Sequence, residues 1–71
     1  MKEKQLEYLN FKGSVRYQLE DQKWFGEILN ITDLVYYEAE SIKGLEDVFK
    51  EAVDDYLDTC KELNREIPWK K

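Results

Sequence analysis

The residues best suited to chemistry in this 71-residue chain are acids that recur at helical spacing in its second half. They are Glu51, Asp54, Asp55, Asp58 and Glu62, called the acidic strip below. Separations of three and four residues put them on one side of a helix, where like charges four apart cost roughly 0.2–0.5 kcal/mol per pair. Acids in the later turns also oppose the helix dipole. The strip is therefore either a solvated face or a contact for an electropositive partner.

Few of the other groups that catalysis uses are present. The sequence has no histidine and a single cysteine, and no hydroxyl stands beside a base in a nucleophile pattern. Carboxylates along one helix seldom converge well enough to hold a metal, so we expect no metal and no cofactor. Cys60 falls among apolar residues, which predicts a buried, unreactive thiol. Gly13, Gly26 and Gly44 lack the spacing of a phosphate-binding loop. We predict that the protein is not an enzyme.

The bulk composition narrows the classes of partner. Sixteen acids against eleven bases give a net charge of −5, which disfavours nucleic-acid binding because that depends on clustered Lys and Arg. No apolar run is long enough for a membrane span, and the N-terminus lacks the hydrophobic core of a signal peptide. One cysteine allows no intrachain disulfide. We expect a cytoplasmic protein that binds neither nucleic acid nor membrane.

A long amphipathic helix is predicted at about residues 42–63. Apolar residues recur there at spacings of three and four, at Ile42, Leu45, Phe49, Ala52, Val53, Tyr56, Cys60 and Leu63. Ser41 suits the N-cap, Asn64 suits the left-handed residue that ends a helix, and Pro68 follows as a stop. We expect residues 65–71 to form a short fraying tail.

The first forty residues predict strands, because apolar and polar residues alternate. A short strand at Leu6 and Tyr8 precedes a break at Lys12-Gly13. Residues 14–20 form a half-buried strand with Val15, Tyr17 and Leu19 on its buried face. Strands at 24–31 and 34–39 follow, joined across Thr32-Asp33. The sequence thus predicts one α+β domain spanning residues 1–71: an antiparallel meander of three to four strands at about 6–40, then one helix.

One helix covers only one face of such a sheet, yet the last two predicted strands are apolar on both faces. There are two ways to cover the second face. One is internal, by strand twist, the first strand and the tail; the other is a partner protein or a second copy of the chain. We favour the latter, with Trp24, Tyr36 and Tyr37 as the oligomer or partner face and a homodimer as the expected assembly. These aromatic side chains are also of the kind that stacks on bases, but the acidic balance favours a core or an interface.

The strands and helix together resemble the N-terminal domain of HicB-type antitoxins over residues 8–68. The resembling segments are Phe11-Lys12-Gly13, Val15, Tyr17, Trp24-Phe25-Gly26, residues 31–35, residues 38–41, Cys60 and residues 62–66. The strongest is Glu51-Ala52-Val53-Asp54-Asp55-Tyr56-Leu57, which keeps the family's order and spacing. Ala39-Glu40-Ser41 differs from the Gly-Asp-Ser that the family commonly has, and Asn64 replaces a glycine.

The resemblance implies a partial, catalytically inactive ribonuclease H-like fold that binds a HicA-type toxin, a small basic ribonuclease that cleaves messenger RNA. It implies that the acidic strip contacts the toxin. Family members commonly continue into a C-terminal DNA-binding region, whereas this sequence ends at Lys71, so operator binding is not expected. The alternative is an orphan, self-associating domain of the same type that has no toxin partner.

Overall fold

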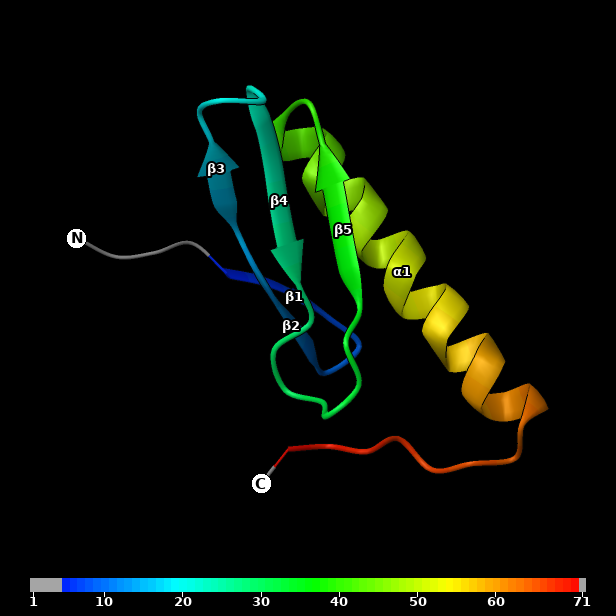
Figure 1. The fold of residues 1–71 in the computed structure, drawn as a ribbon. Helices are drawn as coiled ribbons and strands as arrows, with labels where there is room; N and C mark the ends of the chain where they lie inside the picture. Colours follow the sequence, from blue (N-terminus) through cyan, green and yellow to red (C-terminus); the bar gives the residue numbers. More distant parts are fainter. Residues whose placement is uncertain (1–4, 71) are drawn as a thin grey trace.

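Five short strands precede one long helix in the computed structural model, which describes residues 5–70 (Figure 1). The strands are β1 (Gln5–Tyr8), β2 (Phe11–Ser14), β3 (Arg16–Gln18), β4 (Lys23–Glu27) and β5 (Tyr36–Ala39), and the helix is α1 (Ile42–Glu62). β1 and β2 form a two-stranded antiparallel sheet, and β3, β4 and β5 form a three-stranded one in sequence order. The predicted α+β class and the order of strands before helix are confirmed, although there are five strands where three to four were expected.

β1 and β2 form a hairpin across Leu9 and Asn10, which both have positive φ. Two such residues make the tight turn whose twist matches that of paired strands. The predicted break at Lys12-Gly13 was wrong, because both residues lie within β2. Phe11 and Gly13 are buried there. A glycine inside a strand often marks the close approach of another group, and that is its role here.

The predicted strand over residues 14–20 was wrong in its limits and its burial. β2 and β3 share one register against the next strand, with Gly13 opposite Ile28 and Arg16 opposite Phe25. They are therefore two halves of one strand, interrupted near Val15 without an inserted residue. All three residues of β3 are exposed, and Leu19, expected on the buried face, is 78% exposed. β3 is an edge strand, where alternation in sequence does not guarantee a covered face.

β4 and β5 are shorter than predicted because the chain turns at residues 28–35. Ile28 and Ile31 in this turn are almost fully buried. The Ile28 amide donates to the Val35 carbonyl at 3.0 Å, which continues the β4–β5 pairing by one step. Leu34, expected in a strand, is exposed. The apolar residues of the turn therefore add to the core without extending the sheet.

α1 begins and ends at the residues that the sequence indicated. The Ser41 side chain accepts a hydrogen bond from the Gly44 amide at 3.0 Å, as an N-cap does. Asn64 has φ of 55°, and the Arg65 amide donates to the Cys60 carbonyl at 3.0 Å, which closes a Schellman motif. Leu63, assigned to the apolar stripe, is instead exposed. Within residues 5–70, no helix combines the length and the apolar character needed to cross a membrane.

The chain after α1 is docked, so the prediction of a fraying tail was wrong for residues 65–70. It runs past the ends of the strands opposite the helix start (Figure 1). Trp69 bridges to Ile31, and the Thr32 amide donates to the Pro68 carbonyl at 2.9 Å. The Trp69 ring also lies 4.7 Å from that of Phe11, between centroids. Backbone pairing and aromatic packing together fix a segment whose composition alone indicated disorder.

Candidate functional site

All five residues of the acidic strip are exposed along α1. The buried residues of the helix, Leu45, Phe49, Val53 and Cys60, lie on its opposite side. Core packing therefore sets the orientation of the strip, because turning the helix to hide the acids would expose the apolar residues. The structure brings the five predicted carboxylates together on one outward face.

No residue of the acidic strip forms an ion pair within the described part of the chain. Two ion pairs occur among residues 5–70, Lys23 with Glu38 and Arg65 with Asp33, and neither includes a strip residue. The Tyr8 hydroxyl donates to Asp54 at 3.2 Å. Desolvation, followed by the charge of Asp54, raises the pKa of Tyr8. The strip thus presents several anionic groups to solvent, with the Tyr8 hydroxyl and the Lys61 side chain beside them.

The three aromatic residues predicted for one sheet face do not share it. Cross-strand pairing puts Trp24 and Tyr37 on the side that faces α1, together with Ala39 and Gly26. Tyr37 is 7% exposed, and its ring lies 5.3 Å from that of Phe49. The ring of Tyr37 therefore belongs to the core. Trp24 packs against Tyr17, with 4.9 Å between ring centroids, at the edge of the covered side.

The sheet face that points away from the helix carries Tyr36, which is 66% exposed. Phe25 lies on the same face, half-buried, because its cross-strand partner is Glu38 and not a core residue. Lys23 and Glu38 pair across this face at 3.6 Å. This outward face, which no element of residues 5–70 covers, is thus a mixed surface of two aromatic rings and charges of both signs.

Tyr37 and the Ser14 backbone together explain why β2 and β4 each contain a glycine. A Cβ atom on Gly13 would overlap the Tyr37 hydroxyl, and one on Gly26 would overlap the Ser14 carbonyl oxygen and lie 2.8 Å from the Tyr37 ring. The hydroxyl donates to the Ser14 carbonyl at 2.9 Å, where the β2–β3 strand is interrupted. Burial, then the charge of Glu27, raises the pKa of Tyr37 well above the ordinary tyrosine value.

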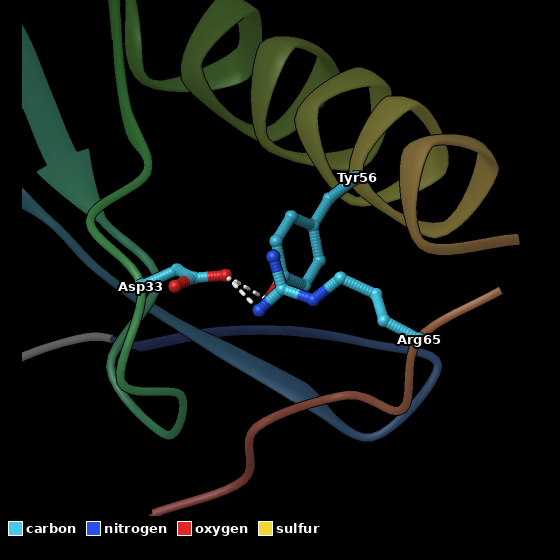
Figure 2. A network of polar contacts seen from close by, with 3 residues as sticks. All are labelled: Asp33, Tyr56 and Arg65. Atoms are coloured by element: carbon cyan, nitrogen blue, oxygen red, sulfur yellow. Dashed lines mark hydrogen bonds and ion pairs between the residues drawn. The ribbon is translucent and has the colours of Figure 1, made fainter. Parts of the chain in front are cut away.

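A polar network that the sequence did not suggest joins three segments at the far end of α1. Figure 2 shows Asp33 accepting from the Tyr56 hydroxyl at 2.7 Å and from the Arg65 guanidinium at 2.9 Å. Burial, then the hydrogen bond to Asp33, raises the pKa of Tyr56 strongly. The network ties the 28–35 turn and the tail to the helix. Its carboxylate is occupied by two donors, so the arrangement suits a structural role.

The remaining reactive groups are few within residues 5–70. Cys60 is free and buried. In the same range, no group of three or more acidic, histidine or cysteine side chains is placed to hold a metal ion. Among residues 5–70, the acidic strip offers exposed carboxylates to a partner, and the outward sheet face offers aromatic side chains beside an ion pair.

Comparisons of the chain with protein-family models, with curated proteins and with solved structures found no match.

Proposed function

We propose that this protein is a non-catalytic antitoxin-like module that binds a basic protein through the acidic strip of α1. The observation that carries the proposal is the set of five exposed carboxylates opposite the core, none of them in an ion pair within residues 5–70. Grouping like charges on one helix face is unfavourable in the free protein. A basic partner would turn this repulsion into attraction between opposite charges. The negative field of the strip would also attract such a partner before contact.

The partner we propose is a HicA-type toxin ribonuclease, whose messenger-RNA-cleaving surface would be basic. The identity of this partner rests on the sequence resemblance to HicB-type antitoxins, of which residues 51–57 are the strongest part. The same resemblance supports a HicB-like, partial ribonuclease H-like fold and a cytoplasmic location. The α+β order of strands before one long helix is compatible with that fold.

Co-expression with a HicA-type toxin tests the proposal. We expect the wild-type chain to restore growth and to co-purify with the toxin. Asp54→Lys with Asp58→Lys should weaken association by about tenfold or more at low salt, mainly by slowing encounter. Both residues are exposed, so the fold should persist.

The matched control is Glu20→Lys with Asp21→Lys, which changes the net charge by the same amount in the exposed β3–β4 turn. The control should bind nearly as well as the wild type. Absence of both growth rescue and co-purification for the wild type would refute the toxin-binding function. Equal weakening by both pairs of substitutions would show that net charge, and not the strip, drives binding.

The outward sheet face favours a second candidate, a self-associating domain with no toxin partner. Phe25 and Tyr36 form an aromatic centre there, beside the Lys23–Glu38 pair. An aromatic centre with a charged rim of both signs is typical of protein interfaces and can be self-complementary. Light scattering that gives the mass of a dimer, reduced to a monomer by Tyr36→Asp, would support this candidate. A monodisperse monomer would exclude it.

A further inference from the structure

The free edge of β5 lies directly beside the acidic strip. In the described part of the chain, β5 pairs with β4 alone, so its other edge has no strand partner (Figure 1). A shallow groove of about 440 Å³ runs between this edge and the helix. Tyr36 and Glu38 line it from β5, and Val48, Glu51 and Asp55 line it from α1. An open strand edge with a groove beside it is a common place for an added strand.

The backbone groups available at this edge follow from the β4–β5 register. The Ile28 amide donates to the Val35 carbonyl, and Gly26 and Trp24 lie opposite Tyr37 and Ala39. Residues of an antiparallel pair alternate between exchanging backbone hydrogen bonds and pointing away. Val35, Tyr37 and Ala39 therefore direct their backbone groups to β4. Tyr36 and Glu38 direct one N–H and one C=O each to the open side.

Charge indicates the kind of segment that would fit. The described lining of the groove includes three carboxylates, those of Glu38, Glu51 and Asp55, and no basic side chain. A second copy added at β5 would bring two such acidic groups together in a protein of net charge −5. A segment that alternates basic with apolar or aromatic residues would instead place its charges on the side that faces α1, beside Glu51 and Asp55, and its other side chains on the outward face with Tyr36.

We propose that the free edge of β5 takes an extended, lysine- or arginine-bearing segment of the partner protein as an added strand. The inference rests on the proposed function, since the same partner would contact the acidic strip. It adds the element by which that partner is recognised: backbone pairing at Tyr36 and Glu38, with Glu51 and Asp55 beside the segment. Binding would then depend on the partner's ability to form a strand as well as on its charge.

Two synthetic octapeptides of equal charge separate these contributions. One alternates Lys with Val and can pair as a strand, and the other alternates Lys with Pro and lacks the N–H groups on every second residue. We expect the Lys-Val peptide to bind about tenfold more tightly than the Lys-Pro peptide. By NMR, it should slow amide exchange at Tyr36 and Glu38 and leave Tyr37 and Ala39, already bonded to β4, little changed.

Glu38→Pro removes the outward N–H while leaving the groups that pair with β4, as an edge strand tolerates. Glu38→Ala is its matched control, because it removes the same carboxylate and keeps the N–H. The proline variant should lose the preference for the Lys-Val peptide, and the alanine variant should retain it. The exchange measurement on the wild-type protein stands even where the proline variant fails to fold.

Equal binding of both peptides, or binding of neither, without slower exchange at Tyr36 and Glu38 would overturn the β5 proposal. Such a result leaves toxin binding through the acidic strip to be decided by co-expression alone. Slow exchange at these two amides without peptide, together with a dimeric mass, would assign the edge to a second copy and overturn the proposal as well. A retained Lys-Val preference in a chain that fails to neutralise the toxin would support strand addition while refuting the proposed function.

Discussion

At the scale of single residues, Asp33 connects segments that lie far apart in the chain. One oxygen of its carboxylate accepts hydrogen bonds from Tyr56 in α1 and from Arg65 in the tail. Hydrogen bonds to a charged group are stronger than those between neutral groups, and each of these joins segments more than twenty residues apart. A single side chain in a surface turn therefore links the helix to the tail.

The raised pKa values of Tyr37 and Tyr56 predict a loss of stability in alkali. Both groups are protonated in the folded protein beyond the pH at which an unfolded tyrosine ionises, about 10. Their contribution is therefore complete below pH 10 and declines as pH rises toward the folded pKa. We expect the free energy of unfolding to fall as pH rises above 10, with the larger share from the buried Tyr37 and a smaller share from Tyr56, whose site is closer to solvent.

Urea unfolding between pH 7 and pH 11.5 measures this effect. Tyr56→Phe should reduce the slope above pH 10, because the remaining contributions come from Tyr37 and from Tyr8, whose pKa values are also raised. The same variant should cost roughly 1–2 kcal/mol at pH 7, where it removes a hydrogen bond to a carboxylate. A wild-type stability that stays constant up to pH 11.5 would contradict the role given to both hydroxyl groups.

Residue spacing in the sequence predicted the face of the helix on which Tyr56 lies, but not the residue that its hydroxyl contacts. The helical period placed it on the apolar stripe, and the structure does find it packed against the core, edge-on to Phe11. Its hydroxyl, however, points to Asp33, a residue that the sequence suggested only as part of a turn. Periodicity assigns a side chain to a face of its own helix, but it carries no information about which distant turn meets that face.

At the scale of elements, β2, β4 and β5 are held together by the ring of Tyr37. The ring occupies the space where Gly13 and Gly26 lack a side chain, and its hydroxyl replaces a strand partner for Ser14. The interruption between β2 and β3 therefore coincides with a bond from β5. The strand break lies where the large side chain of Tyr37 packs between the strands.

Gly13→Ala and Gly26→Ala should each lower the free energy of unfolding by about 1–3 kcal/mol, since an added methyl group overlaps a buried ring or the Ser14 carbonyl. Gly44→Ala is the contrast. Its Cβ would lie 3.1 Å from the Ser41 hydroxyl oxygen, and the gain in helix propensity of about 0.5–1 kcal/mol offsets that contact. Thermal or urea unfolding of the three variants checks the order. A loss at Gly44 as large as at Gly13 would show that the Tyr37 ring has no special effect.

The helix was predictable in both limits because its signals are local. Ser41, Asn64 and the three-to-four period all act within a few residues of the backbone they affect. The strands were predictable in order but not in extent. Their limits depend on Tyr37 filling the glycine spaces and on the 28–35 turn folding inward, and both are contacts between distant residues. Tyr17 and Leu19 show the same dependence, since they alternate correctly and still lie uncovered.

At the scale of the whole molecule, the tail closes the core at the end opposite the helix start, where Tyr56 of α1 also packs on Phe11. Trp69 packs on Phe11 and bridges to Ile31, and the Lys70 amide donates to the Asn30 carbonyl at 2.9 Å. A chain of this size buries only a modest fraction of its surface, so a few residues that add cover are important to it. The composition of the tail, with one proline and several charges, gave no sign of this docking.

Trp69→Ala should lower the free energy of unfolding by about 1–3 kcal/mol, less than for a fully buried tryptophan because Trp69 is 41% exposed. Lys70→Ala, a neighbouring exposed position that keeps the backbone bond to Asn30, should change it by less than about 0.5 kcal/mol. Calorimetry or urea unfolding distinguishes the two. Equal, small effects of both substitutions would contradict the docking of the tail.

The acidic strip was predictable from the sequence, whereas the second surface was not. The helical period determines which side of α1 is exposed to solvent, and the spacing of the five acids places them all on that side. Trp24, Tyr36 and Tyr37 were grouped because both faces of the strands were apolar, yet only Tyr36 points outward. Which face the helix covers is decided by packing between Tyr37 and Phe49, a contact that alternation alone does not reveal.

The docked tail also has a consequence for kinetics. Its contacts join residues far apart in the chain, such as Phe11 with Trp69, and closing so long a loop carries an entropic cost that is repaid late in folding. Contacts that form after the transition state chiefly affect the rate of unfolding. We therefore expect the contacts of the tail to determine the rate of unfolding. The contacts of the helix and of the β4–β5 pair should determine the rate of folding.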